Sequence, residues 1–144
     1  MVLRWVLPSR VRDELHAMAA AEGRPKSRLV EDVWDRQRKL VAGLTPARSL
    51  EVHQMRAVGG ALQAAREHAA LAGGALPKGA SEELLYVRDG FAETLERESQ
   101  RLDVDEAALL LFCWQRDLGK KEQPGLGYSW EQALCKKVGW GWSV

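Results

Sequence analysis

The chain has 144 residues, of which 46% are hydrophobic and 28% are charged, and its formal net charge is +1. This composition is typical of a soluble globular chain with one domain or two very small ones. No apolar run approaches the ~18 residues that a membrane helix needs, so we expect no membrane span. The start lacks the apolar core of a signal peptide, and Cys113 and Cys135 lack metal-site spacing, which together predict a cytoplasmic protein.

The first expected element is a short strand over residues 2–7. Because successive side chains of a strand point to opposite faces, one face of this stretch is apolar and we expect it to face a core. That face holds Leu3, Trp5 and Leu7. The opposite face, which we expect to be exposed, holds Val2, Arg4 and Val6.

Two amphipathic helices are expected after the strand, with a short turn between them. Pro8 ends the strand, and Ser9 is the expected N-cap of the first helix. Gly23 suits the left-handed residue that ends this helix, and Pro25 suits the first turn of the next. Apolar residues recur at helical spacing in both segments. A unit this small, residues 1–43, cannot bury its apolar faces alone, so it needs a second copy.

The order and spacing of these residues resemble the ribbon-helix-helix (MetJ/Arc/CopG-like) family of DNA-binding proteins. The matching residues are the run from Leu3 to Leu15 and then Met18, Ala19, Gly23, Ser27, Leu29 and Val30. The resemblance implies a two-stranded antiparallel ribbon, with one strand from each of two units, that inserts into the major groove of duplex DNA.

Three residues on the expected exposed face of the strand are candidates for reading bases: Val2, Arg4 and Val6. An arginine in the major groove can donate two hydrogen bonds to guanine, which is worth ~1–3 kcal/mol of discrimination, and a valine can contact a thymine methyl group. The alternative is an ordinary edge strand with a solvated Arg4, although proteins usually cover or pair such an edge.

The turn before the second helix carries the candidate phosphate contacts. These are Arg24, Lys26, Ser27 and Arg28. The first backbone N–H groups of a helix and its positive dipole end favour an anion, so a DNA phosphate suits this position. Pro25 departs from the family, which usually has serine or threonine there, and it removes one backbone donor. The alternative is a solvated basic turn.

Residues 44–80 are expected to connect this unit to the rest of the chain, through an alanine-rich helix followed by a glycine- and proline-containing linker. Charge divides unevenly along the sequence. Residues 1–43 hold nine Lys/Arg and six Asp/Glu, whereas residues 81–120 hold five and ten. This asymmetry points to nucleic acid at the N-terminal part and to another partner, such as a basic protein, at the acidic part.

Residues 81–120 repeat the hydrophobic pattern of the first unit when the chain is shifted by eighty positions without a gap. Trp34, for example, matches Trp114. The shift predicts a second strand and two further helices, which resembles the tandem TraY-like arrangement, where two units of one chain pair as a pseudo-dimer. The alternatives are a coincidental helical hairpin, or a homodimer through the first unit with an acidic helical C-terminal domain.

The chemistry of the second unit differs from that of the first. Its expected outward strand positions are Glu82, Leu84 and Tyr86. The turn before its second helix reads Asp103, Val104, Asp105 and Glu106. Carboxylates repel a phosphate, so we expect this unit either to have lost DNA contact or to serve mainly as the partner that completes the fold.

Residues 121–144 are expected to form a tail in which Trp140 and Trp142 either contact bases or a partner, or fold back over the core. The three histidines are scattered, with no triad, no metal-ligand spacing and no phosphate-binding glycine loop nearby. They are His16, His53 and His68. We therefore expect no enzyme activity, no metal and no cofactor.

The sequence as a whole predicts a mainly α protein that binds double-stranded DNA sequence-specifically. Its expected setting is either DNA transfer, as a relaxosome accessory factor, or transcriptional repression. The alternative function is a protein-interaction module, such as an antitoxin, whose acidic C-terminal half binds a basic partner.

Overall fold

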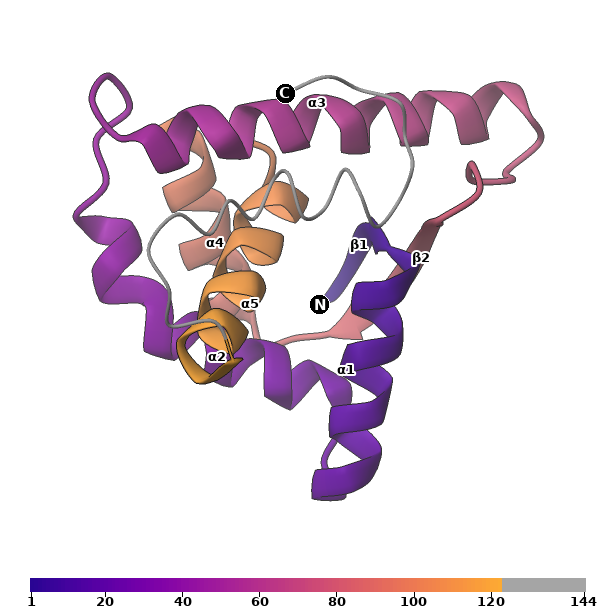
Figure 1. The fold of residues 1–144 in the computed structure, drawn as a ribbon, viewed down its shortest axis with the longest axis horizontal. Helices are drawn as coiled ribbons and strands as arrows, with labels where there is room; N and C mark the ends of the chain where they lie inside the picture. The colour runs from indigo at the N-terminus through magenta and orange to yellow at the C-terminus, as the bar shows by residue number, and fades with distance from the viewer. Residues whose placement is uncertain (123–144) are drawn as a thin grey trace.

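The computed structural model describes residues 1–122, so the predicted tail with Trp140 and Trp142, and also Cys135, lie outside the described residues. The elements follow the chain in the order β1 (Val2–Pro8), α1 (Ser9–Glu22), α2 (Lys26–Ala42), α3 (Leu50–Leu71), β2 (Ala80–Tyr86), α4 (Asp89–Leu102) and α5 (Glu106–Glu122). The described part is mainly helical. Figure 1 shows α3 along one side and α1 and α2 along the opposite side, with the strands between them.

The two strands form an antiparallel two-stranded ribbon within one chain. Arg4 lies opposite Leu84, next to the middle pair Trp5 and Glu83, and Val2 lies opposite Tyr86 at one end. Arg4 and Leu84 are eighty residues apart, so two positions that are equivalent in the predicted repeat lie opposite each other in the ribbon. The sequence left open whether β1 pairs within its own chain or with a second copy, and here its partner is β2.

The helices of the second unit follow those of the first at the same eighty-residue offset. α1 and α4 begin at Ser9 and Asp89, and α2 and α5 begin at Lys26 and Glu106. The offset extends to the residue that ends α1 and α4: Gly23 and Asp103 both have positive φ, at 62° and 55°. Glycine adopts this conformation freely, and aspartate is among the few other residues that tolerate it.

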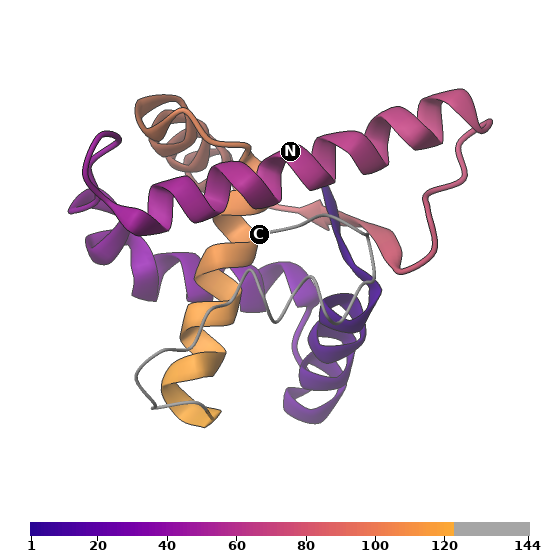
Figure 2. The ribbon, with the colours of Figure 1, turned by 45° about the horizontal axis from the view of Figure 1, so that its top comes forward.

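Equivalent residues also meet across the centre of the molecule, where α2 packs against α5. The Nε2 atom of Gln37 donates to Oδ1 of Asp117 at 3.2 Å, and these two residues are eighty apart. Arg36 donates to both oxygens of the same carboxylate, at 3.1 and 2.9 Å. Contacts between equivalent positions are typical of a two-fold arrangement. Figure 2 shows α5 crossing α2.

The junctions between strands and helices differ in detail from the sequence prediction. Ser9 was expected to cap α1, but Pro8 precedes the helix and no side-chain cap is made. Ser9 is bonded to the beginning of β2 instead: its N–H donates to the carbonyl of Gly79 at 2.8 Å, and its hydroxyl bonds that of Ser81 at 2.6 Å. Pro25 likewise precedes α2 rather than lying in its first turn.

One hydrophobic cluster joins the inward face of the ribbon to all five helices. Trp5 lies in it completely buried, and its Nε1–H donates to the carbonyl of Ala107 at 3.1 Å, which links β1 to α5. Trp34 and Trp114 are buried at equivalent positions of α2 and α5. The ribbon is therefore held by a core to which both units contribute.

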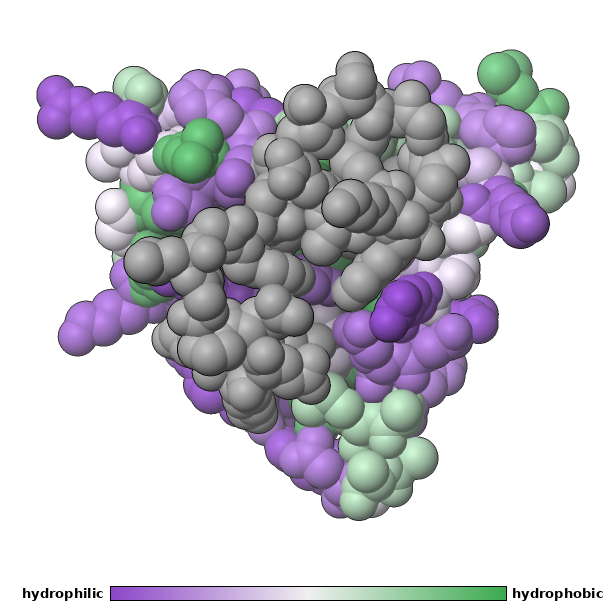
Figure 3. Space-filling model, viewed as in Figure 1, coloured by the Kyte–Doolittle hydropathy of each residue, from purple (hydrophilic) through white to green (hydrophobic). Residues whose placement is uncertain are grey.

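Helix α3 has no counterpart in the repeat and buries one stripe of residues. The stripe consists of Val52, Met55, Val58, Gly59, Leu62 and Ala65. Its C-terminal end extends beyond the core: Leu71 is 91% exposed, and Figure 3 shows hydrophobic surface gathered over this end of the helix. No helix in the described range is long and apolar enough to cross a membrane.

Candidate nucleic-acid interface

The outward face of the ribbon is formed by alternate residues of both strands. Arg4 lies near its centre with its side chain 75% exposed, and it is the only cation among the eight outward positions of β1 and β2. Its Nη1 lies 3.7 Å from Oε1 of Glu82, a diagonal neighbour on the other strand. Val2, Leu84 and Tyr86 are also exposed. The face therefore offers one guanidinium beside apolar and aromatic groups.

The prediction for Val6 is wrong in one respect. Val6 lies on the outward side with Val2 and Arg4, but it is only 2% exposed and belongs to the hydrophobic cluster. A buried side chain cannot contact a thymine methyl group. Two of the three predicted base-reading residues are thus accessible in this structure.

The four predicted phosphate contacts lie together at the start of α2, and each already has a partner within the protein. Arg24 pairs with Asp32, Lys26 pairs with Glu83, and the Nη1 of Arg28 donates to Glu31 at 2.6 Å. The hydroxyl oxygen of Ser27 accepts from the N–H of Tyr86 at 3.0 Å, which fixes the end of β2. Exposed ion pairs are worth only ~0–1 kcal/mol, so a phosphate can replace the carboxylate of Asp32 at low cost.

Sequence reasoning missed the role of Glu31, which is completely buried in α2. Its carboxylate accepts from the N–H of Arg88 at 3.1 Å, from Nε of Arg88 at 2.9 Å, and from Arg28. Burial alone would raise the pKa of Glu31, but these hydrogen bonds outweigh it and hold the pKa below the ordinary value. Glu31 thus joins the start of α2 to the segment that precedes α4.

Glu83 is a second buried carboxylate, on the inward side of β2. Lys26 at the start of α2 and His16 of α1 both bond it. Burial would raise the pKa of Glu83, and the two partners lower it below the ordinary value. The sequence held a signal for this site, because the alternation that places Glu82 and Leu84 outward must place Glu83 inward.

We expect the free energy of unfolding to fall steeply when the pH drops below about 4.5. Glu31, Glu83 and Asp105 all have pKa values below their ordinary ones, so the folded protein binds fewer protons than the unfolded chain in this range. Their stabilisation is present above the unfolded pKa and is lost as the pH falls through the folded pKa. Urea unfolding at pH 7, 5, 4 and 3 measures the effect, and equal stability at pH 5 and pH 3 would contradict it.

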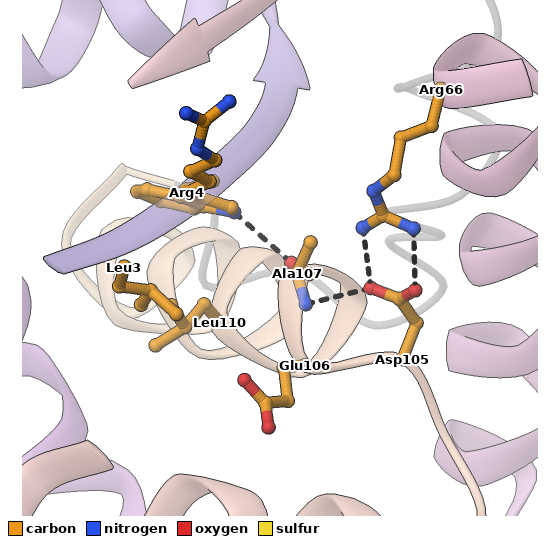
Figure 4. Close-up of a pocket in the computed structure, with 8 residues that line it drawn as sticks. Leu3, Arg4, Arg66, Asp105, Glu106, Ala107 and Leu110 are labelled. Carbon is orange, nitrogen blue, oxygen red and sulfur yellow. Dashed lines mark hydrogen bonds and ion pairs between the residues drawn. The ribbon is translucent and has the colours of Figure 1, made fainter. Parts of the chain in front are cut away.

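The start of α5, which is equivalent to the start of α2, is built from carboxylates. Asp105 caps α5 by accepting from the N–H of Ala107 at 2.8 Å, and both its oxygens bond Arg66 of α3, at 2.7 and 2.9 Å. Figure 4 shows this ion pair beside Arg4, at a cavity of about 230 Å³ between β1, α3 and α5. Burial raises the pKa of Glu106, and the charges of Glu96 and Asp105 raise it further.

Within residues 1–122 we find no cluster of three His, Cys, Asp or Glu side chains arranged to hold a metal ion. Cys113 is buried, and burial raises the pKa of its thiol, which makes it a poor nucleophile. No family model matches the chain, and neither a curated protein nor a solved structure is detectably similar to it.

Proposed function

We propose that the protein is a tandem ribbon-helix-helix protein that binds duplex DNA sequence-specifically, with the ribbon of β1 and β2 in the major groove. The observation that carries this proposal is a two-stranded ribbon, completed within one chain, that exposes Arg4 near its centre. The major groove of B-DNA is about 12 Å wide and admits such a ribbon. The same eighty-residue offset relates the two ribbon strands, the pairs α1/α4 and α2/α5, and the residues that end α1 and α4. It supports two units related by a pseudo-two-fold axis.

Arg4 is the proposed base-reading residue, because its long side chain extends from the ribbon and its guanidinium can donate to the O6 and N7 acceptors of guanine. Val2 lies on the same face and supplies an apolar contact. Arg24 holds a backbone phosphate in place of Asp32, its exposed partner. Lys26 and Arg28 keep their buried partners, Glu83 and Glu31, and add positive charge beside that phosphate. Ser27 adds its backbone N–H, which belongs to the first turn of α2.

The proposed biological setting is accessory binding in DNA transfer, as in a relaxosome, or transcriptional repression. The connector and the second unit make the chain longer than a single strand–helix–helix unit requires, which favours the accessory role. Selection of bound fragments from genomic DNA separates the two settings. Sites at the protein's own promoter indicate a repressor, whereas sites beside a nick or recombination locus indicate an accessory factor.

Replacing Arg4 by alanine is expected to weaken binding to the preferred DNA sequence about tenfold to a hundredfold at fixed salt, because a bidentate contact to guanine is lost. The full chain first selects duplexes from a random library, and fluorescence anisotropy then measures affinity. Arg97→Ala, which removes an exposed arginine of α4, is the matched control and should bind as the parent does. Parent-like affinity of Arg4→Ala would overturn the proposed reading role.

A protein-interaction module of the antitoxin type is the second candidate function. Asp89, Glu93 and Glu96 of α4 are exposed, and they make one side of the second unit acidic. A basic protein partner would fit there. This function predicts that the random library yields no enriched duplex, and that the double variant Glu93→Lys, Glu96→Lys loses its cellular partner while Arg4→Ala keeps it.

A further inference from the structure

The two ends of the outward ribbon face are unequal. Val6 and Tyr86 are equivalent positions, eighty residues apart, and each lies on the outward side near one end of the ribbon. Tyr86 is 70% exposed, whereas Val6 is 2% exposed. A symmetric ribbon would expose both, so something covers the outward face at the Val6 end.

Helix α3 is the element that runs along the covered end. It contacts β1, and its residues Val58, Leu62 and Ala65 are buried, as Val6 is. Arg66 lies close enough to Glu82 for the two charges to interact, and Glu82 is the outward residue opposite Val6. Both views of the fold show α3 passing beside the ribbon (Figures 1 and 2).

Three contacts hold α3 on the turn between α4 and α5. Arg66 forms a bidentate ion pair with Asp105, which Figure 4 shows. Arg56 donates to the carbonyls of Leu102 and Asp103, at 2.9 and 3.2 Å. A Cβ atom at Gly59 would lie 3.1 Å from that of Asp105, so the two segments approach closely where glycine allows it.

The equivalent turn between α1 and α2 has the opposite character. It carries Arg24, Lys26 and Arg28, and Arg24 has only an exposed ion pair to give up. At the start of α5, by contrast, Arg66 already occupies the carboxylate, and Glu106 adds a further acidic group. When DNA approaches the outward face of the ribbon, the phosphates on the first unit's side meet the cations at the start of α2. The phosphates on the second unit's side meet the carboxylates at the start of α5 and helix α3.

We propose that the DNA surface is single-sided: the first unit alone contacts the backbone, α3 shields the second, and the preferred DNA site is one unrepeated motif rather than an inverted repeat. This inference rests on the proposed function. Symmetric ribbon proteins read inverted repeats because operator symmetry mirrors protein symmetry. Here the fold keeps the pseudo-symmetry, but the exposed surface loses it.

The test uses the full chain and the duplexes that it selects from a random library. Ethylation interference on a selected duplex shows which phosphates matter. We expect one short motif, with interfering phosphates on one side of it. An inverted repeat with interference on both sides overturns the inference alone and leaves DNA binding intact. Failure to enrich any duplex overturns the proposed function and this inference together.

Two arginine variants sharpen the test. Arg24→Ala, in the first unit, is expected to lower the slope of log affinity against log salt by about 0.9, the effect of one lost phosphate contact. Arg66→Ala, in α3, should leave that slope unchanged. Circular dichroism tests whether both variants are folded. If Arg66→Ala is unfolded, the ethylation-interference pattern of the parent protein decides the question. An equal loss of slope in both variants would overturn the single-sided surface.

Discussion

Replacing Trp5 by alanine is expected to destabilise the fold by about 3–5 kcal/mol, because removing a buried tryptophan costs its burial and leaves a cavity. Trp5 is completely buried, and it is the residue through which β1 bonds α5. Its loss therefore weakens the ribbon and the contact between the two units at once. Denaturant unfolding followed by far-ultraviolet circular dichroism measures the change, because this signal does not depend on the tryptophan removed.

A pair of phenylalanine variants isolates the hydrogen bond from the packing. Trp5→Phe keeps most of the ring but loses the bond from Nε1 to the carbonyl of Ala107, whereas Trp34 has no hydrogen-bond partner for its Nε1 among the described residues. We expect Trp5→Phe to cost about 1 kcal/mol more than Trp34→Phe, the net value of one hydrogen bond. Equal costs would show that the bond contributes nothing to stability.

The parts of this fold that the sequence predicted are those that local patterns determine. Alternation over residues 2–7 predicted β1, helical spacing predicted α1 and α2, and the eighty-residue shift predicted the second unit with its helices. The shift was informative because it matched large residues, such as Trp34 and Trp114, without a gap. The repeat alone left open whether β1 pairs with β2 or with a second copy, and the structure pairs it with β2, with Arg4 opposite Leu84.

The parts that the sequence did not predict depend on contacts between distant segments. Val6 is buried although the alternation of residues 2–7 places it outward. Nothing in that local pattern indicates where α3, which contacts β1 and begins more than forty residues later, will lie. Glu31 looks like one of many surface charges of α2 in the sequence. Its burial depends on Arg88, which only the packing of α4 beside α2 brings within reach.

Replacing Glu31 by alanine is expected to destabilise the fold by about 2–3 kcal/mol at pH 7. Removing one partner of a buried ion pair costs ~3–5 kcal/mol when the other partner is left buried. Here the side chains of Arg28 and Arg88 are half exposed and can return to water, which reduces the loss. The N–H of Arg88 loses its acceptor in any case. Urea unfolding measures the difference, and Glu93→Ala, an exposed carboxylate of α4, should change stability by less than ~0.5 kcal/mol.

The pH dependence of this variant distinguishes a charge effect from a packing effect. The pKa of Glu31 is lowered in the folded protein, so its stabilisation is present above the unfolded pKa and disappears as the pH falls through the folded value. The parent protein and Glu31→Ala should therefore converge in stability between pH 5 and pH 3. A destabilisation that stays the same at pH 7 and pH 3 would mean that Glu31 acts by filling space. The start of α2 would then be joined to α4 by packing rather than by the carboxylate that both arginines share.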